Sequence, residues 1–169
     1  VAVGEYDFTI RELSRALEDN RSLDDVEGLV YKKGDEIVKN GYRLKIDNLD
    51  EIPFVTSVYK RYLHCRSYFF AAANYPMVMT ITGRGCPFKC FFCVYPQVFH
   101  GRKYRTRSPE NVVDEFEYVV RNFPEVKEMG IEDDCFTANR RHVRDICELL
   151  IKRRIKMKWY CNVRGDVDY

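Results

Sequence analysis

Apolar residues in the second half of the chain follow two different periods. Residues 77–82, 126–131 and 157–163 are apolar runs or alternate with polar residues, which predicts strands. Two sets of apolar residues recur at helical spacing between them: Val112, Val113, Phe116, Val119, Val120 and Phe123, then Val143, Ile146, Cys147, Leu150 and Ile151. Ser108-Pro109-Glu110 predicts the start of the first helix, with serine as N-cap. The order strand, helix, strand, helix, strand predicts an α/β fold with parallel strands.

Chemically active residues follow each predicted strand. A cysteine-rich loop follows the first strand, Asp133 and Asp134 follow the second, and Asn162 and Arg164 follow the third. Because the carboxyl ends of parallel strands meet at one edge, where α/β folds place their sites, we expect these residues to converge.

The first 75 residues carry a weaker pattern. Thr9-Ile10-Arg11-Glu12 matches a capping box and predicts a helix start, and residues 29–38 around Lys33-Gly34-Asp35 predict a hairpin. One helix and one hairpin cannot bury a core alone, so we expect residues 1–46 to be the C-terminal part of an upstream domain. Residues 47–75 are predicted to be a linker, helical in part, and residues 76–169 to begin the α/β domain. The chain starts at Val1 rather than Met, which suggests a piece of a longer protein.

Composition narrows the class of protein. The chain has 169 residues, 46% of them hydrophobic, and a formal net charge of +2. Such a chain can bury a core, and its charge gives no reason to expect a nucleic-acid partner. No apolar run approaches the length of about 20 residues that spans a bilayer. Seven cysteines, an odd number grouped by motif, favour a reduced, cytoplasmic location over a disulfide framework.

The strongest chemical signal is the spacing Cys86-x3-Cys90-x2-Cys93. Soft thiolate ligands select iron–sulfur clusters, zinc or copper(I). Structural sites usually recruit four ligands, so three cysteines on one loop leave a metal position open for a bound molecule. Two alternatives remain at this point. One is a non-catalytic module in which His100 completes a zinc tetrahedron, and the other is an electron-transfer protein that takes a fourth cysteine ligand.

Residues 85–93, Gly-Cys-Pro-Phe-Lys-Cys-Phe-Phe-Cys, resemble the cluster loop of the radical S-adenosylmethionine (radical SAM) enzymes. That loop reads Cys-x3-Cys-x-aromatic-Cys, and Phe92 fills the aromatic position. Residues 104–113, together with Asp133-Asp134-x-Phe136-Thr137, resemble the branch that carries an N-terminal cobalamin-binding domain. The resemblance covers residues 76–169 well and residues 4–54 more loosely.

This resemblance implies both a fold and a reaction. The fold would be the first half of a parallel (β/α) partial TIM-type barrel, preceded by the C-terminal edge of a Rossmann-like cobalamin-binding domain. Cys86, Cys90 and Cys93 would hold a [4Fe–4S] cluster that binds S-adenosylmethionine and reductively cleaves it to a 5′-deoxyadenosyl radical. The implied reaction is cobalamin-assisted methylation, or another modification, of an unactivated carbon. The cobalamin would be bound by a domain mostly absent from this chain.

The resemblance also assigns cofactor contacts. Phe92 would line the adenine, or else be a core aromatic. Asp133 and Asp134 occupy the position at which relatives carry Gly-Gly-Glu, so the resemblance implies that they contact the methionyl ammonium. Asp134 is the better match of the two. The alternative is that these aspartates cap the next helix or lie in solvent. Arg164, and with it Asn162, would meet the cofactor carboxylate or the substrate, or Arg164 forms a surface salt bridge.

The expected partners are a small-molecule substrate and a reductant such as flavodoxin or ferredoxin. Lipid, isoprenoid and tetrapyrrole-like substrates are all consistent with the resemblance, and the residues that select among them are expected beyond residue 169. A basic stretch could hold an anionic group of the substrate, although a solvated loop is the favoured interpretation. Its members are Arg102, Lys103, Arg105 and Arg107.

Overall fold

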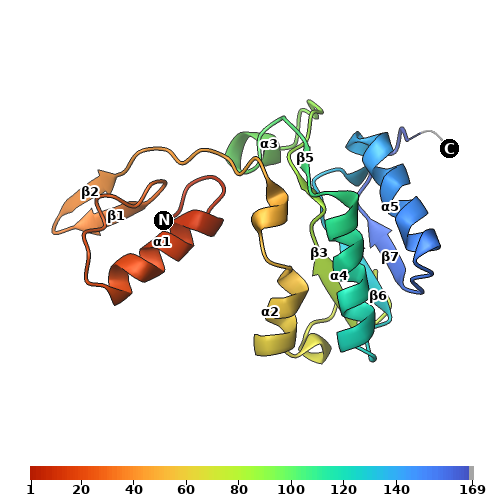
Figure 1. The fold of residues 1–169 in the computed structure, drawn as a ribbon. Helices are drawn as coiled ribbons and strands as arrows, with labels where there is room; N and C mark the ends of the chain where they lie inside the picture. The colour runs from red at the N-terminus through yellow and green to blue at the C-terminus, as the bar shows by residue number, and fades with distance from the viewer. Residues whose placement is uncertain (168–169) are drawn as a thin grey trace.

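The computed structural model describes residues 1–167 and centres on a three-stranded parallel sheet (Figure 1). The strands are β3 (Met77–Thr80), β6 (Glu128–Ile131) and β7 (Lys158–Cys161), in the order β3-β6-β7. Met77 pairs with Glu128, and Glu128 pairs with Lys158, so the three strands start level. The predicted strands and their parallel order are confirmed, although β7 ends two residues before Val163.

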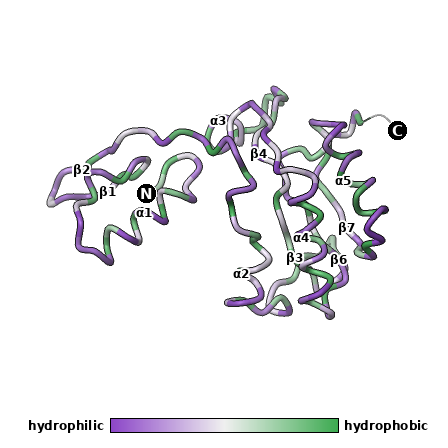
Figure 2. Tube along the Cα trace, in the orientation of Figure 1, coloured by the Kyte–Doolittle hydropathy of each residue, from purple (hydrophilic) through white to green (hydrophobic). Residues whose placement is uncertain are grey.

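Helices α4 (Pro109–Asn122) and α5 (Arg140–Lys152) pack on one face of this sheet. The Ser108 hydroxyl accepts a hydrogen bond from the Asn111 amide, as the sequence predicts for an N-cap. Both helices alternate hydrophilic and hydrophobic positions along their length (Figure 2). Two residues of the predicted apolar faces, Val120 and Ile151, are nevertheless exposed. The core between helices and sheet includes Val78, Val112, Val113, Phe116, Val119, Met129, Ile131, Phe136 and Ile146.

The predicted linker is mostly ordered and partly packed on the sheet. It contains the 3-10 turns η1 (Leu49–Glu51) and η2 (Cys65–Ser67) and helix α2 (Val55–Tyr62). Helix α2 contacts β3 and α4, and the buried Thr56 hydroxyl donates to Glu115 of α4 over 2.8 Å. Residues 55–62 are therefore part of the α/β unit, while the predicted domain boundary itself stays a prediction.

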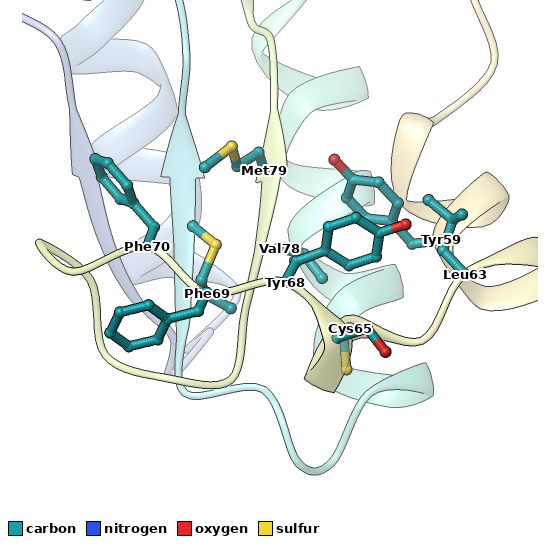
Figure 3. Close-up of a pocket in the computed structure, with 10 residues that line it drawn as sticks. Tyr59, Leu63, Cys65, Tyr68, Phe69, Phe70, Val78 and Met79 are labelled. Atoms are coloured by element: carbon teal, nitrogen blue, oxygen red, sulfur yellow. The ribbon is translucent and has the colours of Figure 1, made fainter.

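The other face of the sheet borders an apolar cavity of about 360 Å³ (Figure 3). Side chains alternate along β3, so Met77 and Met79 point away from the helix-covered core that contains Val78. Aromatic residues of α2 and the segment after it line the cavity. They are Tyr59, Tyr68, Phe69 and Phe70. Among residues 1–167, no helix is long and apolar enough to cross a membrane.

The N-terminal residues form a small separate cluster around α1 (Asp7–Glu18) and the hairpin β1 (Val30–Lys33) and β2 (Glu36–Lys39). The hairpin prediction is confirmed. The capping-box prediction is wrong, because Thr9 is the third residue of α1 and is fully buried. Its hydroxyl donates to the Glu27 carbonyl over 2.9 Å and so ties the helix to the segment before the hairpin.

Ion pairs of Arg84 and Arg105 join this N-terminal part to the α/β unit. Arg105 pairs with Glu5, and both side chains are buried. Arg84 pairs with Asp7 through two hydrogen bonds of 2.7 and 3.0 Å. Burial acts to raise the pKa of Glu5, but the hydrogen bond and charge of Arg105 outweigh it and hold that pKa below its usual value. Both arginines flank the cysteine loop, so these pairs fix the N-terminal part beside it.

Candidate functional site

The two ends of the cysteine loop, residues 82–86 and 101–107, lie side by side and are hydrogen-bonded to each other; we call this paired segment the neck. Strand β4 (Gly83–Arg84) pairs antiparallel with β5 (Arg105–Thr106), and the Cys86 amide donates to the Gly101 carbonyl over 3.0 Å. The sequence predicts only a cysteine-rich loop here and does not reveal this ladder, because each strand has only two residues. Cys86 ends the first side of the neck, and Cys90, Cys93 and the short helix α3 (Tyr95–Val98) lie between the two sides.

Two glycines allow the neck to close. A β-carbon on Gly83 would lie 2.6 Å from the Tyr104 ring. Gly85 has φ of +98°, a conformation that side chains rarely adopt, and a β-carbon there would collide with the Lys103 carbonyl. Glycine at both positions therefore has a steric reason.

Cys86, Cys90 and Cys93 are partly exposed free thiols. The Cys93 amide donates to the Cys90 carbonyl over 3.1 Å, so these two cysteines share one turn. Burial raises the pKa of the Cys86 thiol. Three accessible thiols on one glycine-based loop fit the donor set of an iron–sulfur cluster, in which each thiolate binds a different iron.

The zinc alternative needs a fourth ligand from His100. The His100 Nδ1 atom instead lies 3.1 Å from Asp134 Oδ2. Within residues 1–167, no three His, Cys, Asp or Glu side chains converge as a single metal ion requires. In this structure His100 therefore faces Asp134, and in the described part of the chain the cysteines have no histidine beside them as the zinc alternative requires.

Asp133 lies just after β6, and its carboxylate is hydrogen-bonded to both sides of the neck. Its side chain is 1% exposed. The two oxygens accept hydrogen bonds from four donors: Thr82 N at 2.6 Å, Thr82 Oγ1 at 2.5 Å, Gly83 N at 3.1 Å and Tyr104 Oη at 2.6 Å. Burial raises the pKa of Asp133, although these hydrogen bonds act in the opposite direction.

Asp134 is the more accessible member of the pair. Its Oδ2 atom accepts a hydrogen bond from Gly85 N over 3.0 Å and faces His100. Burial acts to raise the pKa of Asp134, but the hydrogen bond and charge of His100 outweigh it and hold that pKa below its usual value. The charged Asp134 carboxylate is thus hydrogen-bonded to Gly85, the residue that precedes Cys86. Neither aspartate caps α5, because Asn139 does so.

Asn162 and Arg164, which follow the third strand, lie at the same carboxyl edge of the sheet, here called the rim. The Arg164 guanidinium lies 3.9 Å from the centre of the Phe88 ring, which belongs to the cysteine loop. Arg164 also pairs with Asp166 over 2.6 Å, so the salt-bridge interpretation describes part of its surroundings. Asn162 donates to Glu132 over 3.1 Å. Phe92 is 79% exposed and meets only the edge of Phe91, so it is not a core aromatic.

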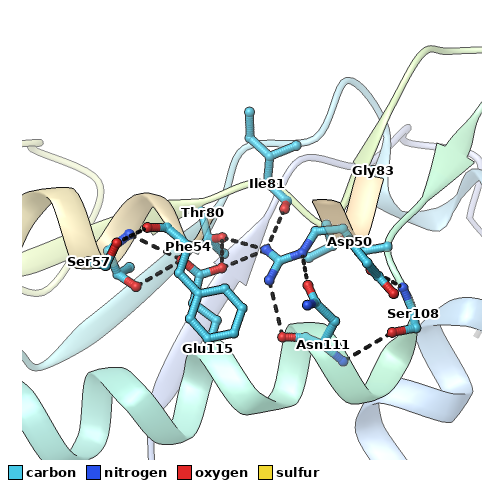
Figure 4. Close-up of polar contacts among 12 residues, drawn as sticks. Asp50, Phe54, Ser57, Thr80, Ile81, Gly83, Ser108, Asn111 and Glu115 are labelled. Carbon is cyan, nitrogen blue, oxygen red and sulfur yellow. Dashed lines mark hydrogen bonds and ion pairs between the residues drawn. The ribbon is translucent and has the colours of Figure 1, made fainter. Parts of the chain in front are cut away.

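Two of the four basic residues at positions 102–107 are buried, which contradicts the interpretation of this stretch as a solvated loop. Arg105 and Arg107 are buried, Arg105 against Glu5 and Arg107 against Glu115. Around Arg107, the Ile81 carbonyl and the Asn111 side chain accept further hydrogen bonds (Figure 4). Both guanidinium groups are neutralised by the chain's own carboxylates, which removes them as candidates for an anionic substrate group. Arg102 and Lys103 remain exposed.

Sequence reasoning did not single out Thr82, Tyr104 or Glu5 as contributors to this site. Thr82 and Tyr104 stand on opposite sides of the neck and reach the same aspartate, and Glu5 is 100 residues from Arg105. The available signal was one tyrosine within a run of basic residues, since the hydroxyl of a buried tyrosine usually finds a hydrogen-bond partner.

Comparison with known proteins tests the family resemblance. The family model described as the radical SAM superfamily matches residues 80–166. The chain belongs to the radical SAM superfamily. The match begins at the end of β3 and covers the cysteine loop, both aspartates and the end of β7, so it includes the whole rim described above.

Individual radical SAM relatives extend the match into the N-terminal part. An uncharacterized methyltransferase of Pyrococcus horikoshii is 31% identical over 97% of this chain and 34% of its own length. The anaerobic magnesium-protoporphyrin IX monomethyl ester cyclase of Cereibacter sphaeroides is 33% identical over 82% of this chain and 22% of its own length. This chain therefore spans about a third or less of the curated relatives it matches.

A solved structure supports the fold. The cobalamin-dependent S-adenosylmethionine radical enzyme OxsB matches 96% of this chain and 22% of its own, with a TM-score of 0.70 and 25% sequence identity. The prediction of the first part of a partial (β/α) barrel is confirmed. The zinc-module and electron-transfer alternatives lose their support, because the matched family is one of enzymes.

Proposed function

We propose that this chain forms the cofactor-binding part of a radical SAM enzyme that modifies an unactivated carbon of a small molecule. The observation that carries the proposal is Cys86-x3-Cys90-x2-Cys93 on a glycine-necked loop at the carboxyl edge of the parallel sheet. Three free thiols there would hold a [4Fe–4S] cluster and leave one iron without a protein ligand. When bound, that cluster supplies the electron that cleaves S-adenosylmethionine into methionine and a 5′-deoxyadenosyl radical.

The chain's own residues would bind and orient the cofactor. Asp134 offers a charged carboxylate to the methionyl ammonium, and its low pKa keeps it ionised. Phe92 is largely exposed, so its ring would be free to line the adenine. Arg164, whose guanidinium lies over the Phe88 ring, would pair with the methionyl carboxylate. A contact between Asp133 and the methionyl ammonium would be weaker, because both Asp133 oxygens already accept hydrogen bonds from this chain.

Two of the relatives named above support a reaction subclass: one is a methyltransferase and the other a magnesium-protoporphyrin IX monomethyl ester cyclase. We infer a methylation or ring-forming reaction on a lipid, isoprenoid or tetrapyrrole-like substrate. Cobalamin assistance rests on the likeness to OxsB, which is cobalamin-dependent. A low-potential reductant such as flavodoxin or ferredoxin would supply the electron, in a cytoplasmic location where the thiols stay reduced.

Anaerobic reconstitution with iron and sulfide tests this proposal. We expect four irons per chain, a reduced-cluster spectrum that changes when S-adenosylmethionine is added, and 5′-deoxyadenosine as a product under reducing conditions. Stoichiometric zinc that iron does not displace, together with a spectrum indifferent to S-adenosylmethionine, would refute it.

A further inference from the structure

The position of Asp133 lets its side chain form hydrogen bonds to both sides of the cysteine-loop neck. The Glu132 amide donates to the Thr80 carbonyl over 2.9 Å, which continues the β3–β6 ladder past the ends of both strands. This continuation sets Asp133 beside the corner where β3 turns into β4. Thr82 and Gly83 lie on the outgoing side of the neck, and Tyr104 lies on the returning side.

The hydrogen bonds of Asp133 use all of its capacity. A carboxylate has about four acceptor sites, and four donors from this chain lie within 3.1 Å of it. All four donors are neutral, and the side chain is almost completely buried. Burial and the Asp133 charge both raise the pKa of Tyr104, so its hydroxyl stays protonated and remains a donor.

The rest of the loop depends on this attachment. Between the two sides of the neck the backbone hydrogen bonds are local, as between Cys93 and Cys90 or between Gln97 and Val94. Local bonds shape the loop but do not orient it relative to the sheet. The neck ladder, Asp133, Asp134 at Gly85 and His100, and Arg164 over Phe88 supply that orientation.

We propose that Asp133 is a positioning residue that anchors both sides of the neck and so sets how Cys86, Cys90 and Cys93 face the rim. The proposal deepens the proposed function and rests on it: Asp133 acts through Thr82, Gly83 and Tyr104 rather than by touching the cofactor. A misplacement near 1 Å in such a site can cost about 100-fold in rate.

The first test measures amide hydrogen exchange in the full-length, cluster-free protein. In Asp133→Asn, one carboxylate oxygen becomes an amide that donates, so it opposes the existing donors. We expect the Thr82 and Gly83 amides to exchange about 10- to 100-fold faster, which corresponds to about 1.5–3 kcal/mol for a hydrogen bond to a charged group. Glu132→Gln is the matched control, since Glu132 bonds to Tyr160 and Asn162 and not to the neck. Unchanged exchange in Asp133→Asn would overturn the proposal.

The second test uses the reconstituted protein and separates positioning from direct contact. We expect Asp133→Asn to lower kcat for S-adenosylmethionine cleavage at least tenfold, to leave KM within about twofold, and to alter the reduced-cluster spectrum before the cofactor is added. A raised KM with unchanged kcat would assign Asp133 to the cofactor instead. Tyr104→Phe removes one donor and should produce a smaller change of the same kind even if Asp133→Asn does not fold. If the wild type binds no cluster, the proposed function fails, while the exchange experiment still decides the role of Asp133.

Discussion

The guanidinium of Arg107 lies 2.6 Å from the carboxylate of Glu115 in the interior of the α/β unit. The same carboxylate accepts hydrogen bonds from Thr56 of α2 and Thr80 of β3. One buried ion pair therefore connects the helix before the sheet, the first strand, the end of the cysteine-loop neck and helix α4 (Figure 4).

Glu115→Gln should destabilise the protein strongly. It leaves the Arg107 charge buried without a counter-charge, a change that costs about 3–5 kcal/mol. Urea unfolding measures the difference. Glu117→Gln is the control on the same helix, because Glu117 is only partly buried and pairs with partly exposed or exposed arginines. It should cost less than about 1 kcal/mol. Equal losses in the two variants would contradict the prediction.

Alanine substitution should separate the cluster ligands from the other cysteines. We expect Cys86→Ala, Cys90→Ala and Cys93→Ala each to lose most of the iron bound after anaerobic reconstitution, because each would remove one of three protein ligands. Cys135→Ala should retain it, since Cys135 is buried and its sulfur faces Thr137. Iron loss in Cys135→Ala would instead favour a cluster with four protein ligands and an electron-transfer role.

Gly85→Ala should damage the neck. Its φ of +98° is unfavourable for alanine, and the added methyl group would meet the Lys103 carbonyl. We expect a loss of at least about 1–3 kcal/mol in urea unfolding and lower iron retention. Gly41→Ala is the control, because nothing lies within 4 Å of its added β-carbon. A neutral Gly85→Ala would show that the neck can shift.

His142 should make stability depend on pH. This side chain is 4% exposed, and its Nε2 atom has no hydrogen-bond partner. Burial lowers the pKa of His142 to about 4, from an ordinary value of 6.5. The unfolded chain therefore binds a proton first as pH falls. Stability is lost from about pH 6.5 downward and the loss is complete below about pH 4, at about 1.4 kcal/mol per pH unit and about 3 kcal/mol in total.

Comparison of urea unfolding at pH 7 and pH 5.5 checks this prediction. Wild type should lose about 1.4 kcal/mol more than His142→Gln over this interval, because glutamine does not titrate. The same pH dependence in both proteins would assign the effect to other groups.

The features that could be predicted from sequence are those encoded within a few residues. Three cysteines within eight positions, the Ser108-Pro109 helix start and the helical spacing of Val112, Phe116 and Val119 are local signals, and the structure contains each of these elements. The parallel order of the strands also followed from the sequence, because alternating strands and helices leave few ways to connect them. The convergence of the cysteine loop, Asp134 and Arg164 on one rim follows from that order.

Tertiary structure decided which polar groups meet. Periodicity indicates that a position is buried, but it does not indicate which distant residue compensates a buried charge. The sequence therefore placed Arg105 and Arg107 in solvent, whereas Glu5 and Glu115 hold them inside. For the same reason the sequence does not indicate that Thr82, Gly83 and Tyr104 donate hydrogen bonds to the Asp133 carboxylate. By itself the sequence determined the three-cysteine motif and the edge of the sheet on which the cysteines lie. The folded chain determined what holds them there, since a hydrogen bond requires two groups to meet at about 3 Å and positions far apart in sequence do not record that distance.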